Sequence, residues 1–443
     1  MDLRLPDQIA WIVAADMGLG HQRAAYPLQS LGGGRVITAG APEFSSPREN
    51  KLWRRMRNTY EGISRLSHIP VVGSFFFNLM DRIQEISPYY PFRDLSHATL
   101  QVKYLSSLVR KGLGATLLDI AVPSGLPLVS TFFATAMAAN QRRHPNFLVV
   151  TDTDINRVWV AENPTESNIR YCVPCRRALR RLKEYGVPDS HIYLTGFPLP
   201  KENLGSPDLE ILKLDLAQRM IYLDPNRHFW DLHRIEAEYY LSAENCIKRS
   251  NRILTLTFAV GGAGAQKEIG WEILKSLKKR ILDRQIRLNL VAGIRPEVLQ
   301  YFAAVIRQLD LEDQKGLGVN IVYAPTLEKY FQRFNLVLRT TDILWTKPSE
   351  LSFYSGLGIP IIMGPPLGSQ EHYNTKWLME IRAGIPQEDP ALCSEWLFDL
   401  LNEGRLAQSA WDGFLNARKC GTYKIEEILR YGDMSRDPSP LKR

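Results

Sequence analysis

The sequence has few cysteines, and it lacks a long apolar segment at its start. Its five cysteines among 443 residues are too sparse for a disulfide framework and favour a reducing, cytoplasmic setting. Cys172 and Cys175 form a single Cys-x-x-Cys pair, whereas a structural zinc site needs four ligands, so we expect a strand-to-helix junction there. The first apolar run, Ile9 to Ala15, has the length of one strand and leads into a glycine loop. We therefore expect no signal peptide.

A second apolar run, from Ile120 to Asn140, contains no charged residue and approaches the length of a membrane span. Pro123, Gly125 and Pro127 interrupt it early. These breaks favour a buried strand, a turn and the start of a buried helix over a transmembrane helix.

The net charge of +8 indicates an anionic partner, such as a nucleotide, a lipid headgroup or a nucleic acid. We find no recognition-helix or RNA-stacking motif beside the basic residues, so we expect no nucleic-acid partner. The hydrophobic content of 45% and charged content of 23% are typical of a globular protein.

The order of apolar and amphipathic segments predicts an α/β protein with two Rossmann-like, doubly wound parallel sheets, because strands alternate with helices in both halves. We expect an N-terminal domain (1–200), a helical insertion or interdomain segment (201–249), a C-terminal domain (250–405), C-terminal helices (406–433) with packing against the N-terminal domain as one option, and a tail (434–443). The expected strands are 9–15, 128–133, 147–151, 158–160, 169–173, 192–195, 253–260, 288–292, 321–323, 337–338 and 359–363. The main expected helices are 23–31, 175–185 and 269–282.

Two motifs of the first half follow predicted strands. Gly18-Leu19-Gly20-His21 lies between a strand and a helix, where Gly18 and Gly20 allow close approach of a ligand and His21 could take a proton from a hydroxyl. A tight turn with an incidental histidine is the alternative. Thr151-Asp152-Thr153-Asp154 contains an Asp-x-Asp, which can hold a metal-bound diphosphate. We favour a role for Asp152 in orienting an acceptor, or in capping the next segment.

In the second half, Gly261-Gly262-Ala263-Gly264 follows a strand and opens a helix. Its backbone N–H groups could hold a diphosphate, although a plain turn is the alternative. The Gly-Lys-Ser/Thr ending of a P-loop and the Gly-x-Gly-x-x-Gly spacing of dinucleotide sites are both missing.

Polar residues near two later helix starts complete the candidate site. Ser349 is a possible helix cap, and Glu350 could accept hydrogen bonds from two ribose hydroxyls or could merely favour the helix dipole. Gln370, Glu371 and Asn374 carry amide and carboxylate groups that suit sugar hydroxyls.

Residues 50–92 mix basic side chains with large apolar ones, including Lys51, Trp53 and Tyr89-Tyr90-Pro91-Phe92. This pattern fits contact with an anionic membrane surface. A basic surface helix followed by aromatic core residues is the alternative.

Together these motifs resemble the GT-B glycosyltransferases, in the branch with the monogalactosyldiacylglycerol synthases and the peptidoglycan lipid-intermediate N-acetylglucosaminyltransferase. The resemblance covers roughly residues 9–200 and 250–380. The matching positions are Gly18 to His21, Thr151, Asp152, Trp159, Tyr171, Val173, Pro174, Gly196 to Pro198, Gly261 to Gly264, Glu350, Gln370, Glu371 and Asn374. The chain departs from the family pattern at Lys347-Pro348, beside the expected nucleotide pocket.

The resemblance implies two domains facing a central cleft and a sugar donor activated by a nucleoside diphosphate, most often UDP. It implies donor contacts from Gly261, Gly262, Gly264, Ser349, Glu350, Gln370, Glu371 and Asn374, with His21 and Asp152 acting on the acceptor. It implies no tightly bound cofactor, no metal ligand and no Mg²⁺ requirement. The expected acceptor is a lipid or lipid-linked hydroxyl, reached by a cytoplasmic protein at the inner face of the plasma membrane. A nucleotide-sugar epimerase and a non-catalytic nucleotide-sugar or lipid-binding scaffold are the alternatives.

Overall fold

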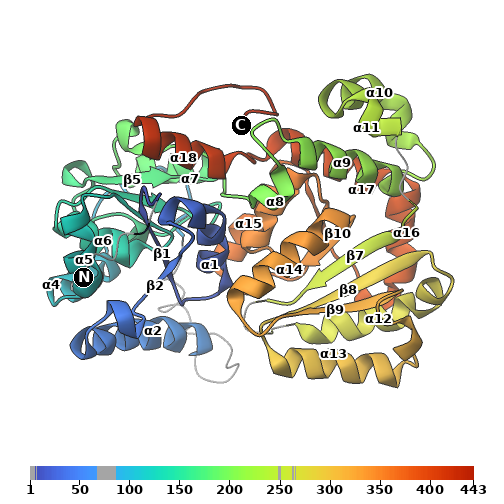
Figure 1. Ribbon diagram of the computed structural model, residues 1–443, viewed down its shortest axis with the longest axis horizontal. Helices are drawn as coiled ribbons and strands as arrows, with labels where there is room; N and C mark the ends of the chain where they lie inside the picture. The colour runs from blue at the N-terminus through green and yellow to red at the C-terminus, as the bar shows by residue number, and fades with distance from the viewer. Residues whose placement is uncertain (1–4, 6, 67–85, 248–250, 262–263, 265) are drawn as a thin grey trace. The chain divides into compact units, whose positions relative to one another are not determined.

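The computed structural model describes residues 5, 7–66, 86–247, 251–261, 264 and 266–443, and for residues 57–66 it describes the backbone alone. The chain divides into two compact units, each built around its own six-stranded sheet (Figure 1). The first unit contains Met1–Pro198, Gly368–Tyr373 and Cys420–Arg436. The second contains Leu199–Leu367, Asn374–Lys419 and Asp437–Arg443.

The first sheet is parallel throughout, with the strand order β2-β1-β3-β4-β5-β6. Its strands are β1 (Trp11–Ala15), β2 (Ile37–Ala39), β3 (Leu128–Ser130), β4 (Asn146–Val149), β5 (Ile169–Cys172) and β6 (Ile192–Tyr193). Every residue of β1, β3 and β4 is buried, as parallel strands covered on both faces should be.

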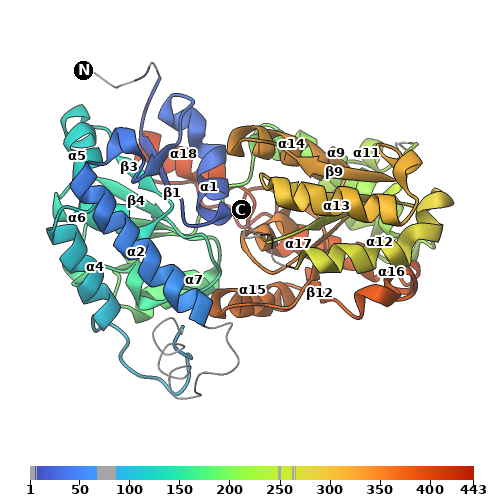
Figure 2. The same cartoon turned by 90° about the horizontal axis from the view of Figure 1, so that it is seen from below.

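Helices cover both faces of this sheet. The helices and 3₁₀ turns of the first unit are α1 (Leu19–Ala25), η1 (Tyr26–Gly32), η2 (Pro42–Phe44), α2 (Pro47–Leu66), α4 (Leu100–Arg110), α5 (Ala115–Ala121), η3 (Val122–Ser124), α6 (Phe133–Gln141), η4 (Arg157–Trp159), η5 (Pro164–Glu166), α7 (Arg176–Glu184), η6 (Asp189–His191) and α18 (Gly421–Tyr431). Leu28 of η1 and Ile425 and Ile428 of α18 form one core with Ile12 and Val129 of the sheet. Figure 2 shows α2, α4 and α6 in the same unit.

The second sheet is also parallel, with the order β12-β11-β10-β7-β8-β9. Its strands are β7 (Leu254–Ala259), β8 (Ile286–Gly293), β9 (Val319–Tyr323), β10 (Ile343–Thr346), β11 (Ile361–Met363) and β12 (Gly384–Pro386). The predicted fold class, an α/β protein with two doubly wound parallel sheets, is confirmed. The expected central cleft between the domains stays a prediction.

Helices α12 (Lys267–Leu282) and α13 (Pro296–Gln308) cover one face of the second sheet, and α14 (Leu327–Thr340) lies on the other (Figure 1). The remaining elements of this unit are α8 (Lys201–Leu204), α9 (Glu210–Leu223), α10 (His228–Leu241), α11 (Ala243–Ile247), η7 (Glu312–Gln314), η8 (Glu350–Leu357), η9 (Pro390–Leu392), α16 (Cys393–Asn402) and α17 (Arg405–Asn416). Helix α15 (Ser369–Glu380) has its first residues in the first unit and the rest in the second.

Residues 201–247 are helical, and α9 is part of the second unit. Arg219 of α9 has a guanidinium group that is almost fully buried. Its Nε donates to the carbonyl of Thr341 at 2.7 Å, and its Nη1 donates to the carbonyl of Leu357 at 2.8 Å. Burial lowers the pKa of Arg219 to about 10, so the group remains charged at neutral pH. It therefore caps the carboxyl ends of α14 and η8.

Two strand predictions are wrong. Val158–Val160 falls on the 3₁₀ turn η4, and Val337–Leu338 lies in α14, while the real strand β10 follows a few residues later. Helix α14 buries Tyr330, Phe334 and Leu338, which are four residues apart, and this spacing marks a helix rather than a strand. Among the residues that the structure describes, no helix is both long and apolar enough to span a bilayer.

Candidate functional site

The order of the first sheet reverses between β1 and β3, since β2 lies on one side of β1 and β3 on the other. In parallel sheets, ligands bind beside the carboxyl ends of the strands at such a switch point. The loop after β1 contains Gly18, whose φ of 104° and ψ of 167° are accessible to glycine alone. Gly20 lies in the first turn of α1 and is half-buried. The glycine motif therefore turns the chain at the place where this fold binds ligands.

His21 is fixed by the loop after β3. Its Nδ1 lies 2.6 Å from the carbonyl oxygen of Thr131, and the Thr131 hydroxyl donates to the His21 carbonyl at 2.9 Å. Because a carbonyl only accepts, Nδ1 must carry the proton, and the neutral ring then has its lone pair on Nε2. Phe132 packs edge-on against the imidazole, with ring centroids 5.1 Å apart, and Trp159 lies 6.2 Å away. The ring is held in one orientation and one tautomer.

The two carboxylates of the Asp-x-Asp motif have different environments. Asp152 is half-buried, but Asp154 is fully buried and accepts from Arg181 Nε at 2.7 Å and Nη2 at 3.0 Å. Burial raises the pKa of Asp154, and the ion pair with Arg181 opposes this rise. The Arg181 guanidinium carbon lies 4.0 Å from the centroid of the Tyr89 ring. Asp154 therefore forms a buried ion pair within the first unit. Of the two carboxylates, Asp152 is the one that is partly exposed and accessible to a ligand.

His21 and Asp152 follow β1 and β4, which are separated by β3. With neighbouring strands about 4.8 Å apart, their chain positions are about 10 Å apart along the carboxyl edge of the sheet. Trp159 comes from the segment after Asp152 and reaches the His21 ring. The first sheet thus brings the two predicted acceptor-side residues to one edge.

The second sheet also has a switch point, between β7 and β10. The glycine loop follows β7, and the Gly264 N–H donates to the Gly261 carbonyl at 2.7 Å in a tight turn. Gly264 has a φ of +73° and Gly261 is buried, while Gly262 lies outside the described residues. Gln266 is the N-cap of α12, and no side chain caps that helix end. The N-terminal N–H groups of α12 therefore lie next to the loop at the ligand-binding edge.

Lys347, directly after β10, contacts the glycine loop. A Cβ on Gly261 would come within 2.7 Å of Lys347 Cε and 3.5 Å of its Nζ. The absence of a side chain at Gly261 allows the lysine to approach this closely, and it brings an ammonium group beside the loop. In the sequence, Lys347 stood out only as a departure from the family pattern. Its position directly after a strand was the one sign that it could place a cation at the switch point.

Ser349 and Glu350 lie in the chain segment after β10, and Asn374 lies in α15, after β11. Ser349 is the N-cap of η8, but its side chain makes no capping hydrogen bond, so the suggested capping role is wrong. Glu350 is half-buried in the first turn of η8. Asn374 is fully buried, and its Nδ2 donates to the carbonyl of Pro348 at 3.2 Å. Asn374 thereby ties α15 to the loop that carries Glu350.

Gln370 and Glu371 lie in the first turn of α15 and are half-buried. They belong to the portion of α15 that packs with the first unit, whereas Asn374 belongs to the second. Tyr373, in the next turn, donates its hydroxyl to the carbonyl of Ile86 at 3.1 Å. Their expected contact with a sugar stays a prediction.

The Cys-x-x-Cys pair lies at a strand-to-helix junction, as expected. Cys172 ends β5 and Cys175 is the N-cap of α7. Both are buried free thiols, and burial raises the pKa of each to about 12. Across the described part of the chain, no group of three or more His, Cys, Asp or Glu residues is placed to hold a metal ion.

The predicted membrane segment, 50–92, divides into parts with different environments. Trp53 is buried and donates to Glu49 at 3.0 Å, so the core interpretation holds for this residue. Residues 67–85 lie outside the described residues. Beyond them, Tyr90 and Phe92 are 64% and 76% exposed, and their rings stack edge-on with centroids 4.9 Å apart. Arg180 lies 5.6 Å from the Tyr90 ring, which places a cation beside this exposed aromatic pair.

No model of a known protein family matches the chain. Two curated proteins are similar in sequence, and both are processive diacylglycerol β-glucosyltransferases. The protein of Bacillus pumilus (strain SAFR-032) is 26% identical over 294 residues, which cover 66% of this chain and 63% of the relative. That of Bacillus subtilis (strain 168) is 23% identical over 265 residues, or 58% of this chain and 56% of the relative. The chain thus matches less than two thirds of the length of these relatives.

Solved structures with a similar arrangement have much lower sequence identity. The UDP-GlcNAc 2-epimerase of Neisseria meningitidis, bound to UDP-GlcNAc, is 10% identical, with 95% of this chain and 96% of that chain covered and a TM-score of 0.46. MurG of Acinetobacter baumannii is 13% identical, with 74% and 78% covered and a TM-score of 0.43.

The two parallel α/β units and the loops at their switch points define the architecture of a GT-B protein. The sequence matches show that the chain is similar to two diacylglycerol glucosyltransferases over 66% and 58% of its length.

Proposed function

We propose that this protein is a hexosyltransferase that moves a sugar from a UDP-sugar to a hydroxyl group of a diacylglycerol-type lipid. The sequence similarity to two diacylglycerol glucosyltransferases is the observation that carries this proposal. Glycine loops at the switch points of both sheets support it, because they provide separate places for an acceptor and a donor.

In the proposed reaction, the acceptor oxygen forms a bond with the anomeric carbon while the bond from that carbon to the diphosphate oxygen breaks. The hydroxyl proton passes to His21 Nε2, and UDP leaves. The hydrogen bond from Nδ1 to the Thr131 carbonyl supports this role, since it keeps the lone pair on Nε2 and stabilises the imidazolium that forms. Asp152 would orient the acceptor.

On the donor side, the diphosphate would lie against the Gly261–Gly264 loop and the first turn of α12. Backbone N–H groups and the helix dipole favour the negative charge that develops as the bond breaks. The Lys347 ammonium beside Gly261 would add a cation to the same place. Glu350 would accept from the ribose, with Ser349, Gln370, Glu371 and Asn374 beside the nucleotide and sugar.

We further propose that transfer needs no divalent cation. The burial of Asp154 against Arg181 supports this, because it removes one of the two carboxylates that an Asp-x-Asp metal site requires. Chelation with EDTA should leave the rate unchanged. A rate that falls with EDTA and returns with Mg²⁺ would contradict this part of the proposal.

The lipid acceptor would be reached by peripheral contact with an anionic membrane, at the cytoplasmic face. The exposed aromatic pair Tyr90 and Phe92, with Arg180 beside it, supports this contact, since aromatic rings and cations both favour the membrane interface. Replacing both rings with serine should weaken sedimentation with phosphatidylglycerol vesicles, while water-soluble donor binding is unchanged.

The decisive experiment measures glycolipid formation from radiolabelled UDP-glucose and diacylglycerol in mixed vesicles. Loss of a general base typically slows a reaction by about 10²–10⁴-fold, so His21→Gln should reduce kcat by at least about 100-fold with little change in the donor KM. His97→Gln, at a side chain that is 88% exposed, is the matched control and should retain activity.

If no glycolipid forms, a thermal-shift screen against UDP, GDP and TDP shows whether the protein fails to bind the donor nucleotide or binds it without transferring sugar to the acceptor. A nucleotide at about 100 times its Kd adds roughly 2.7 kcal/mol of stability. Stabilisation by UDP without transfer would favour a scaffold or an epimerase, and no stabilisation by any nucleotide would remove the donor site.

A further inference from the structure

A row of polar side chains crosses three strands of the second sheet on the face that α14 covers. Thr257, Asn289 and Asn320 are register partners on β7, β8 and β9. Asn320 Nδ2 donates to Asn289 Oδ1 at 3.4 Å, and Asn289 Nδ2 donates to Thr257 Oγ1 at 3.1 Å. Strands of doubly wound sheets are normally apolar at such positions. Three neighbouring polar side chains are therefore unusual on a covered face of such a sheet.

The row opens into a pocket at the β9 edge of the sheet. The pocket has a volume of about 320 Å³ and lies between the strands and α14. Its lining is formed by Arg287, Asn289, Gly316, Asn320, Arg333, Leu336, Val337 and Thr340. Two arginines and two asparagines thus surround a space large enough for a small metabolite.

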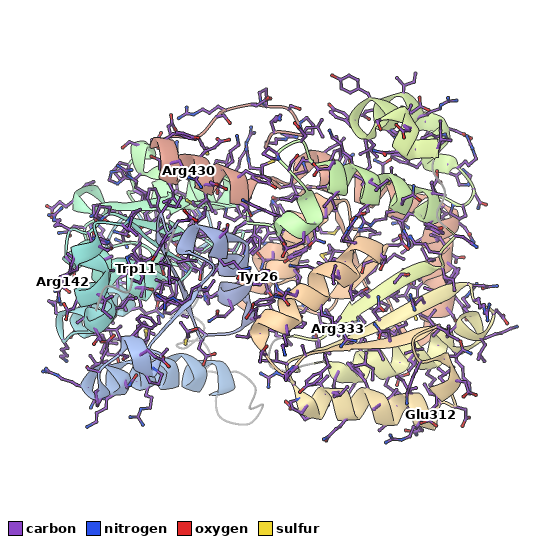
Figure 3. The ribbon with its side chains drawn as sticks, viewed as in Figure 1. Trp11, Tyr26, Arg142, Glu312, Arg333 and Arg430 are labelled. Atoms are coloured by element: carbon purple, nitrogen blue, oxygen red, sulfur yellow. The ribbon has the colours of Figure 1, made fainter. Side chains whose placement is uncertain are left out.

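The two arginines give the pocket a positive charge. Arg287 donates from Nη2 to the Gly316 carbonyl, and its buried Nε has no hydrogen-bond partner. Arg333, labelled on α14 in Figure 3, donates to the carbonyl of Tyr323 at 3.0 Å. Neither guanidinium makes an ion pair with any acidic side chain in the described part of the chain. An unpartnered donor on a partly buried cation favours an anionic ligand.

The carboxyl end of α14 also faces this region, and a helix end of that polarity would repel an anion. Its carbonyls already have cationic donors: Arg219 binds the carbonyl of Thr341, and Arg252 Nη1 donates to the carbonyl of Thr340 at 3.3 Å. The negative end of the helix is therefore compensated before a ligand arrives.

The pocket is separate from the proposed donor loop. Arg287 lies at the amino end of β8, six residues before Gly293 at its carboxyl end. At about 3.3 Å per residue, that is about 20 Å along the strand. A ligand at Arg287 would therefore occupy the opposite edge of the second sheet from Gly261.

We propose that this pocket is a second ligand site of the protein, and that it binds the phosphate group of a small, water-soluble phosphorylated metabolite. Guanidinium groups recognise phosphate through paired N–H donors, and Arg287 and Arg333 supply such donors from two sides. The volume exceeds that of phosphate alone, which leaves room for the group that carries it. The site is independent of the transferase activity.

The test is isothermal titration of the full chain with inorganic phosphate and with glycerol 3-phosphate, at constant ionic strength with chloride as the balancing anion. Arg287→Gln and Arg333→Gln should each weaken binding at least tenfold. Arg307→Gln, an exposed arginine on α13 outside the pocket, removes the same charge and should leave binding unchanged.

The side chain of Arg333 is exposed, so its replacement should not impair folding even if Arg287→Gln does. Binding that persists in Arg333→Gln would place the phosphate elsewhere, for example at the Gly261 loop, and would overturn the proposal. Equal losses in Arg307→Gln, or binding to phosphatidylglycerol vesicles without binding to either soluble phosphate, would overturn it as well.

Discussion

Asp152 and Asp154 provide a matched pair of substitutions that separates ligand contact from structural support. Asp154 and Arg181 are both fully buried, and two hydrogen bonds of 2.7 and 3.0 Å join them. Asp154→Asn removes the negative charge and one acceptor but leaves the Arg181 charge in place. Arg177 Nη1 also lies 3.9 Å from Asp154 Oδ2, so the substitution removes a negative charge near two guanidinium groups.

Breaking a buried ion pair by removing one partner costs about 3–5 kcal/mol. Arg181 keeps a second ion pair with Glu184 at 3.4 Å, which places the expected cost at the lower end of that range. We expect Asp154→Asn to lower the free energy of unfolding of the first unit by this amount. Asp152→Asn affects a half-buried carboxylate outside that ion pair, so the expected loss is below about 1 kcal/mol. Asp152→Asn should instead reduce the rate of sugar transfer.

The assay is urea denaturation followed by tryptophan fluorescence, with both variants and the wild type measured at one pH. A loss below about 1 kcal/mol for Asp154→Asn would refute the assigned role of the ion pair. An equal loss in the two variants would show that the motif acts as one structural unit, and Asp152 would then lose its proposed contact with the acceptor.

Three further outcomes are expected. Arg219→Met leaves the carbonyls that it binds without donors and should lower the stability of the second unit by about 1–3 kcal/mol in the same assay, whereas a loss below about 1 kcal/mol would contradict the capping role. Because burial raises the pKa of Cys172 and Cys175 to about 12, only about one thiol in 10⁴ is ionised at pH 8, so neither should react with Ellman's reagent until the protein is denatured. Glu350→Ala should weaken UDP binding by about 1–3 kcal/mol in calorimetry, and an unchanged Kd would remove the ribose assignment.

Most of the fold could be predicted because its strands are continuous apolar runs that end at glycine loops. The run before Gly18 and the one before Gly261 both form interior strands of their sheets. The errors fell on short segments. Val337 and Leu338 are β-favouring neighbours, but the burial of Phe334 and Leu338 on one side places them in a helix. Pairs of residues carry too little periodicity to separate the two structures.

The candidate site was less predictable, because its chemistry depends on contacts across the sequence. Nothing near His21 in the chain indicates that the Thr131 carbonyl fixes its tautomer, since the two residues are 110 positions apart. The sequence alone also does not distinguish Asp152 from Asp154, although Arg181 forms its ion pair with Asp154. Such assignments require the tertiary structure.

Arg219 has a consequence for the order in which the chain is made. It emerges from the ribosome 138 residues before Leu357, one of the carbonyls that it finally binds. Before those residues are synthesised, the Arg219 guanidinium lacks these carbonyl acceptors. Its burial would then be unfavourable, so α9 cannot pack early against a partial sheet. Packing of the second unit is thereby delayed until β10 and η8 have been synthesised. A fragment that begins at residue 250 would contain every strand of the second sheet but would lack Arg219, which caps α14 and η8.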